Sequence, residues 1–215
     1  MTDSITEINN IIKLIQTKNF EDAEKKINEL IIKDPYSTQL YNFKGTLYAE
    51  QSKNDEALEN YNKSLELDPN NFKTYNNLGV LMHKLFKFKE ASKYYKKSIE
   101  INPEFYTSKN NHGVTLIFLG KFDEAMKCFD EVIKNDPNNY EPHLNKGNIL
   151  RNRGFIDDSI ICFENALKIN PTNSKIHNDF ALALLKTQSN FKKSIYHLNK
   201  AIEIDPNNFK PYLNL

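Results

Sequence analysis

The stretch FKTYNNLGVLMHKLFKFKEASKYYKKSIEINPEF, residues 72–105, is the unit from which most of the sequence is built. In its first half, residues recur at the spacing of one helix face, at Tyr75, Leu78, Gly79 and Met82. The second half repeats this spacing after a short break, at Ala91, Tyr95 and Ser98. Pro103 then ends the pattern, because a proline has no amide hydrogen with which to continue a helix. The stretch predicts two antiparallel helices joined by a short turn.

Prolines and glycines mark the same unit along the rest of the chain. Five prolines are spaced by 34 residues and a sixth follows after 35, at Pro35, Pro69, Pro103, Pro137, Pro171 and Pro206. When each unit is numbered from the third residue after its proline, all six glycines fall at position 8 or position 15. This phase predicts a single array over residues 1–215, with repeats at about 4–37, 38–71, 72–105, 106–139, 140–173 and 174–208 and a partial seventh at 209–215.

Large and small residues alternate at fixed positions of the unit. The glycine at position 8 is expected to face a small residue at position 20, and a large residue at position 24 precedes a small one at position 27. The pattern resembles the tetratricopeptide repeat family, whose 34-residue signature has these residue types at these positions. The resemblance covers nearly the whole chain. It implies an all-α, right-handed superhelical solenoid of antiparallel helix pairs, with about six repeats and the start of a seventh.

Composition narrows the classes of partner. The 29 basic and 28 acidic residues give a net charge of +1, which argues against nucleic acid and against an anionic membrane as the main partner. No segment is long and apolar enough to span a membrane, and the first residues lack the features of a signal peptide. Cys128 and Cys162 occupy the same position of adjacent units, too far apart for a disulfide. We therefore expect an intracellular, cytoplasmic protein.

One face of the first helices is left free by the packing pattern, and the family resemblance implies that it lines a concave groove. Position 6 on this face carries a ladder of carboxamides and one carboxylate, at Asn77, Asn111, Asn145 and Asp179. A carboxamide both donates and accepts hydrogen bonds, as the backbone of an extended peptide does. The groove is expected to include also Lys73, Val80, Val114, Phe118, Asn148 and Lys175. The alternative is that abundant asparagine on a solvated face makes the ladder a matter of composition.

The first helix carries an apolar stripe that later units lack, at Ile5, Ile8, Ile12 and Ile15. It lies opposite the face that packs on the second helix, so the hairpin alone leaves it uncovered. Two interpretations follow. The stripe is a docking surface, either for the apolar anchor of a partner or for a second copy in a homodimer through a terminal repeat. Alternatively, it is covered internally by the first residues or by the curled solenoid.

The sequence favours a protein–protein interaction scaffold that binds a partner polypeptide, as an extended peptide, along the groove. It contains no catalytic, cofactor or metal-binding motif, and His143 and His177 stand at a packing position. The carboxylate clamp that chaperone-binding relatives use for C-terminal tails is missing, because position 5 never carries lysine. Two alternatives stay open: the non-catalytic arm of a larger enzyme or assembly, glycosyltransferase-like or ciliary or transport, and, less favoured, an RNA-binding helical repeat. The partner itself cannot be identified.

Overall fold

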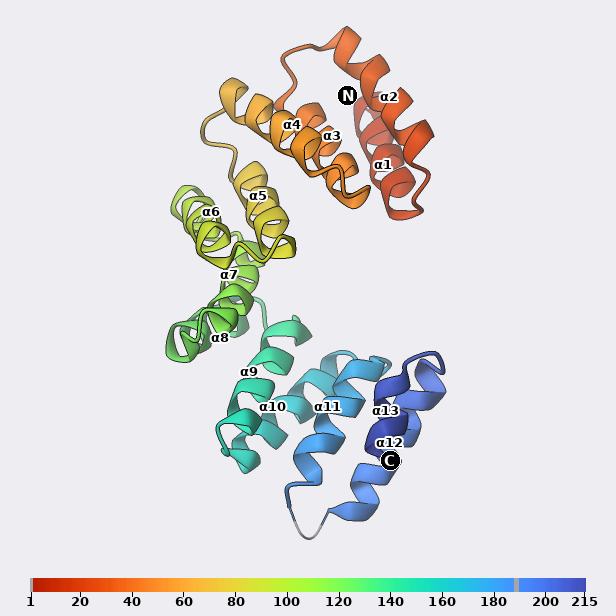
Figure 1. Cartoon of the computed structure of the whole chain (residues 1–215), viewed down its shortest axis with the longest axis vertical. Coiled ribbons are helices and arrows are strands. Elements are labelled where there is room, and N and C mark those ends of the chain that lie inside the picture. The colour runs from red at the N-terminus through yellow and green to blue at the C-terminus, as the bar shows by residue number, and fades with distance from the viewer. Residues whose placement is uncertain (1, 188–189) are drawn as a thin grey trace. The chain divides into compact units, whose positions relative to one another are not determined.

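The computed structural model describes residues 2–187 and 190–215, with side chains from Thr6 onward, and all regular structure within these ranges is α-helical (Figure 1). The first repeat contains α1 (Thr2–Gln16) and α2 (Phe20–Lys33). The helices that follow are α3 (Thr38–Glu50), α4 (Asn54–Leu67), α5 (Phe72–Lys84), α6 (Phe88–Ile101), α7 (Tyr106–Phe118), α8 (Phe122–Asn135), α9 (Tyr140–Asn152), α10 (Ile156–Ile169), α11 (Ser174–Leu184), α12 (Phe191–Ile204) and α13 (Phe209–Asn214). None of the described helices is long and apolar enough to cross a lipid bilayer.

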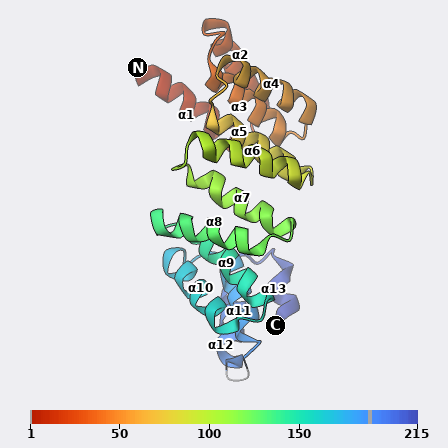
Figure 2. The same cartoon turned by 90° about the vertical axis from the view of Figure 1, so that its left-hand side faces the viewer.

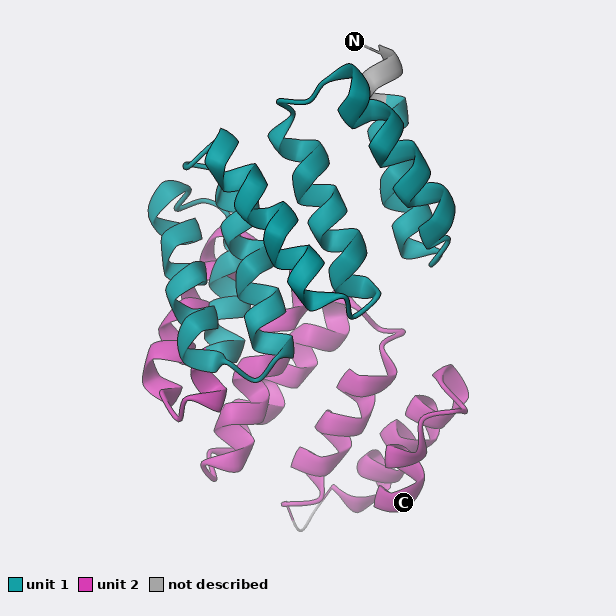
Figure 3. Cartoon of the chain, turned by 45° about the horizontal axis from the view of Figure 1, so that its top comes forward, with its two compact units in different colours: residues 1–115 teal, residues 116–215 magenta. Residues whose placement is uncertain are grey.

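The chain divides into two compact units, residues 1–115 and residues 116–215, and the division falls within α7 (Figure 3). In the first unit α3 packs on α4 and α5 packs on α6, and the latter two lie side by side in both views (Figure 2). First helices also contact one another, since α3 touches both α1 and α5. In the second unit α9 pairs with α10 and α11 pairs with α12, and α11 touches α9 and α13. Each unit is thus a stack of helix pairs.

Asparagine side chains and residues with positive φ determine where the helices begin and end. The side chains of Asn71, Asn139, Asn173 and Asn208 each accept a hydrogen bond from a backbone amide in the first turn of the next helix. An asparagine at this place stabilises the helix, because its side chain bonds to an amide that has no partner within the helix. In the turns within pairs, position 15 has positive φ in each of the five repeats between residues 4 and 173, at Lys18, Ser52, Phe86, Gly120 and Gly154. Glycine suits this conformation, yet three repeats adopt it without glycine.

The glycine at position 8 lies directly against the aromatic ring at position 24. A Cβ atom added to Gly79 would stand 2.6 Å from Cε1 of Tyr95, and Tyr95 is almost fully buried. The same contact joins Gly45 to Tyr61 and Gly147 to Phe163. The nearest neighbour of the glycine is therefore the ring, and not the small residue at position 20 that the sequence suggested. The glycine allows a flat ring to pack between the two helices of a pair.

Candidate functional site

Two carboxamides of the ladder, those of Asn77 and Asn111, bond to asparagines of the preceding repeat. In the first unit Asn77 Nδ2 donates to Asn42 Oδ1 at 3.0 Å, and Asn111 Nδ2 donates to Asn76 Oδ1 at 3.2 Å. In the second unit Asn214 makes the same bond to Asn178, at 2.9 Å. In each case a position 6 side chain reaches the position 5 side chain one repeat earlier. Asn77, Asn111 and Asn214 are therefore held in place by bonds between neighbouring first helices.

The position 5 asparagines of the first unit's central repeats, Asn42 and Asn76, are buried and are anchored by hydroxyl groups. Asn42 Nδ2 donates to Thr74 Oγ1 at 2.7 Å, and Asn76 Oδ1 accepts from Ser108 Oγ at 3.0 Å. Thr74 and Ser108 in turn bond to a serine of the second helix, with Ser64 Oγ 2.9 Å from Thr74 Oγ1. These asparagines are not a solvated polar face produced by composition. They connect three helices, a role that repeat spacing alone did not reveal.

The internal bonds leave acceptor capacity on the oxygen of Asn77. Asn77 is half-buried, and its Nδ2 is directed at Asn42 and, at 3.4 Å, at Thr46 Oγ1. Its Oδ1 accepts one hydrogen bond, from Asn76 Nδ2 at 3.2 Å, and an amide oxygen has two lone pairs. The carboxamide thus donates inward and can still accept from a group outside, such as a peptide amide.

The second unit modifies this arrangement around Asp179. Position 5 of the preceding repeat is the buried Leu144, which offers no carboxamide. The Asp179 carboxylate accepts instead from Asn148 Nδ2 at 3.0 Å and from Asn178 Nδ2 at 3.2 Å. Arg151 donates to the Asp179 carbonyl oxygen at 2.9 Å. The Oδ1 atom of Asn148 is buried and has no hydrogen-bond partner among the described residues.

The remaining predicted groove residues differ in exposure. In the first unit, Val80 and Val114 are half-buried and Lys73 is exposed. In the second, Asn145 is half-buried, Lys175 is exposed and Phe118 is 59% exposed. All of them lie on the first helices of their pairs, α5, α7, α9 and α11.

The structure separates the members of the apolar stripe. Ile15 is 9% exposed and belongs to the core formed with Ile11, Ala23, Ile27, Leu40 and Leu47. It is covered because α1 packs on α3 as well as on α2. Internal cover is thus the interpretation that fits Ile15. Ile8 is half-buried, Ile12 remains 36% exposed, and the side chain of Ile5 lies outside the described residues.

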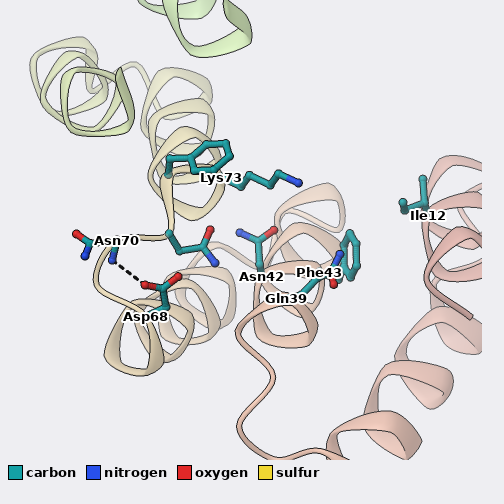
Figure 4. A pocket seen from close by; sticks show the side chains of 9 residues that line it. Ile12, Gln39, Asn42, Phe43, Asp68, Asn70 and Lys73 are labelled. Atoms are coloured by element: carbon teal, nitrogen blue, oxygen red, sulfur yellow. Dashed lines mark hydrogen bonds between the residues drawn. The ribbon is translucent and has the colours of Figure 1, made fainter. Parts of the chain in front are cut away.

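Ile12 lines a pocket of about 450 Å³ in the first unit, together with Gln39, Asn42, Phe43, Asp68, Asn70, Asn71, Phe72 and Lys73. Figure 4 shows Ile12 on one side of the opening, Phe43 opposite to it, and the amino end of Lys73 extending toward the side of Ile12. Asp68 lies at the other end, where it accepts from the backbone amide of Asn70 at 3.0 Å. Apolar walls and a cation therefore meet in one place.

The sequence places Lys73 in the expected groove and Ile12 in the apolar stripe, and it does not predict that both line one pocket. The pocket forms because α1, α3 and the start of α5 converge, which spacing within one repeat cannot predict. Phe43 was missed as a site residue. Its signal was present, because it occupies the ladder position that carries asparagine or aspartate in the units from residue 72 onward.

The two histidines at position 4, His143 and His177, are both at least partly buried. His177 is buried, with Nδ1 2.9 Å from Nδ1 of His197 and Nε2 2.9 Å from the carbonyl oxygen of Pro171. Burial and the neighbouring His177 lower the pKa of His197 to about 4. His143 is half-buried, and burial lowers its pKa too. Within the described residues no three potential metal ligands lie together.

Comparison with solved structures supports a repeat solenoid. YrrB, described as a TPR protein with an unusual peptide-binding site, is 21% identical, with TM-score 0.64 over 87% of this chain and 96% of that chain. PilF of Pseudomonas aeruginosa is 16% identical, with TM-score 0.82 over 97% and 95%. MamA of Desulfovibrio magneticus RS-1 is 15% identical, with TM-score 0.68 over 80% and 96%. At these identities the likeness concerns the fold alone.

Sequence models of the repeat match directly. One described as TPR repeat matches residues 45–85, and two described as tetratricopeptide repeat match 72–105 and both 106–139 and 140–173. No curated protein sequence matches the chain significantly. The matches together cover residues 45–173, more than half of the sequence. Three of them, at 72–105, 106–139 and 140–173, have the same bounds as the repeats defined by the proline spacing. The chain therefore belongs to the tetratricopeptide repeat family.

Proposed function

We propose that this chain is a non-catalytic scaffold that holds an extended segment of a partner polypeptide against the first helices of its repeats. The observation that carries the proposal is the interlocked carboxamide ladder. Asn77 and Asn111 are held by bonds to buried asparagines, and Asn77 keeps a free lone pair on its oxygen. Such a side chain is suited to accept from the amides of an extended peptide.

Preorganisation makes this arrangement effective. An asparagine that is already fixed loses little rotamer freedom when a ligand binds, which removes part of the usual cost of ordering an interface. Each new hydrogen bond contributes about 0.5–1.5 kcal/mol net. Several such hydrogen bonds can form along an extended peptide, and Val80 and Val114 add apolar contacts. Affinity then depends on the backbone of the peptide as well as on its side chains.

Other features agree with a polypeptide partner in the cytoplasm. YrrB, which shares the fold, is described as having a peptide-binding site. No disulfide joins the two described cysteines, Cys128 and Cys162, as a reducing compartment favours. The charge balance of 29 basic and 28 acidic residues gives RNA little electrostatic attraction.

Selection from a random peptide library tests the proposal. Selected peptides are measured by calorimetry against the wild type and against the variant Asn77→Ala, Asn111→Ala, Asn145→Ala. We expect the variant to lose about tenfold or more in affinity, since up to three net hydrogen bonds are removed. Circular dichroism checks that its helicity is kept.

The matched control is Asn62→Ala with Asn199→Ala, two exposed asparagines on second helices. Their loss should leave affinity unchanged. A library that yields no binding peptide, or a triple variant that binds as tightly as the wild type, would refute the proposed function.

A further inference from the structure

We propose that the pocket between α1, α3 and the start of α5 selects partner segments in which a large apolar side chain stands next to an aspartate or glutamate. The inference rests on the proposed function, because it assigns a sequence preference to the same peptide-binding face. The pocket is lined by Ile12, Phe43 and Lys73, one from each of these helices.

The apolar half of the motif is inferred from Ile12 and Phe43. Ile12 is 36% exposed although neighbouring Ile11 and Ile15 are buried in the core. Phe43 packs on that core with part of its surface and lines the pocket with the rest. Burial of apolar surface is favourable, so a ligand that covers both side chains gains affinity. The volume of about 450 Å³ lies within the usual range of about 300–1,000 Å³ for ligand sites.

The acidic half of the motif is inferred from Lys73. Its side chain is exposed, and no carboxylate forms an ion pair with it among the described residues. Its Nζ lies 5.9 Å from the centre of the Phe72 ring, a contact that leaves the charge available. Asp68, the one acidic residue of the pocket, is at the opposite end and is bonded to Asn70. Lys73 therefore has no acidic partner within the pocket, and its ammonium group can pair with a carboxylate of the ligand.

The position of the pocket favours a peptide over a free small molecule. Asn42 lines the pocket and also accepts the hydrogen bond from Asn77, so the pocket adjoins the ladder. Asn42 cannot turn away, because its Nδ2 is bonded to Thr74 at 2.7 Å. A peptide that bonds to Asn77 would place neighbouring side chains beside Phe43 and Lys73. An apolar residue and an adjacent carboxylate fit these two groups.

The test compares peptides selected from one random library by the wild type, by Lys73→Glu and by Ile12→Asn. The wild type should enrich an apolar residue adjacent to aspartate or glutamate. Lys73→Glu should replace the acidic preference by lysine or arginine and keep the apolar one, whereas Ile12→Asn should weaken the apolar preference alone. For a selected peptide, Lys73→Glu should reduce affinity about threefold to tenfold at low salt, and less at high salt.

The variants are chosen so that folding is preserved. Lys73 is exposed in the first turn of α5, where a glutamate is favoured by the helix dipole, and Ile12 is partly exposed. Lys93→Glu, an equal charge change at an exposed residue of α6, is the control and should leave the selection unchanged. Peptides without the apolar and acidic pair, or an unchanged preference in Lys73→Glu, would overturn this inference while leaving peptide binding intact. A wild type that selects no peptide would instead refute the proposed function.

Discussion

Substitution of Gly79 by alanine tests the packing on which the repeat depends. An added Cβ would lie 2.6, 2.7 and 2.9 Å from three carbons of the Tyr95 ring, and this ring is 2% exposed and cannot swing away. Overpacking of this kind costs about 1–3 kcal/mol. Alanine is intrinsically better than glycine in a helix by about 0.5–1 kcal/mol. For a ring held this closely, an overpacking cost of about 2–2.5 kcal/mol is expected, and the net destabilisation is then about 1–2 kcal/mol. The melting temperature should fall by about 2–8 °C.

The chain itself offers the compensating pair. In the repeat at 174–208, position 8 is Ala181 and position 24 is Leu198, both buried, in place of glycine and an aromatic ring. In a Tyr95→Leu background, Gly79→Ala should therefore be neutral or stabilising. A double-mutant cycle followed by thermal and urea unfolding measures the coupling between the two sites. If Gly79→Ala stabilised the wild type, or destabilised both backgrounds equally, the ring would not be the group that excludes a side chain.

Three further substitutions probe other contacts. Asn42→Ala should cost about 1–3 kcal/mol in urea unfolding, since it removes the hydrogen bonds from Asn42 to Thr74 and from Asn77 to Asn42, whereas exposed Asn62→Ala should be nearly neutral; equal effects would refute the buried network. The folded pKa of His197 is about 4, below its ordinary 6.5, so the folded state resists its protonation. Stability should fall as pH falls from about 7 toward 4, and His197→Gln should show a smaller fall; identical pH profiles would contradict this. Phe86→Gly should raise the melting temperature, because Phe86 is 79% exposed and has φ 59, a conformation that is unfavourable for residues other than glycine. Gly120 and Gly154 occupy the same position in other repeats. A lowered melting temperature would show that the exposed ring stabilises the turn.

Repeat phase and helix positions could be predicted because local chemistry determines them. Pro69 and Pro103 mark the unit, and α5 and α6 lie within residues 72–101 as the helical spacing requires. The capping role of Asn71 also follows from its place in the turn, since a cap bonds to amides only a few residues away.

Contacts between repeats could not be predicted in the same way. The bond from Asn77 to Asn42 joins residues 35 apart, and its existence depends on how closely α3 and α5 approach. Helical spacing places Asn77 on a face but does not say what stands opposite. Ile15 is another example, since its burial requires α3 to pack on α1.

The most direct test of peptide binding along the first helices is an NMR titration of the labelled protein with a peptide selected from the library. Binding along this face predicts that the side-chain amide signals of Asn77 and Asn111 and the backbone amide of Val80 shift with a common dissociation constant. The amides of Lys93 and Lys97, which are exposed on the second helix α6, should not move. Shifts confined to second helices, with the signals of Asn77 and Asn111 unchanged at saturation, would contradict binding along the ladder.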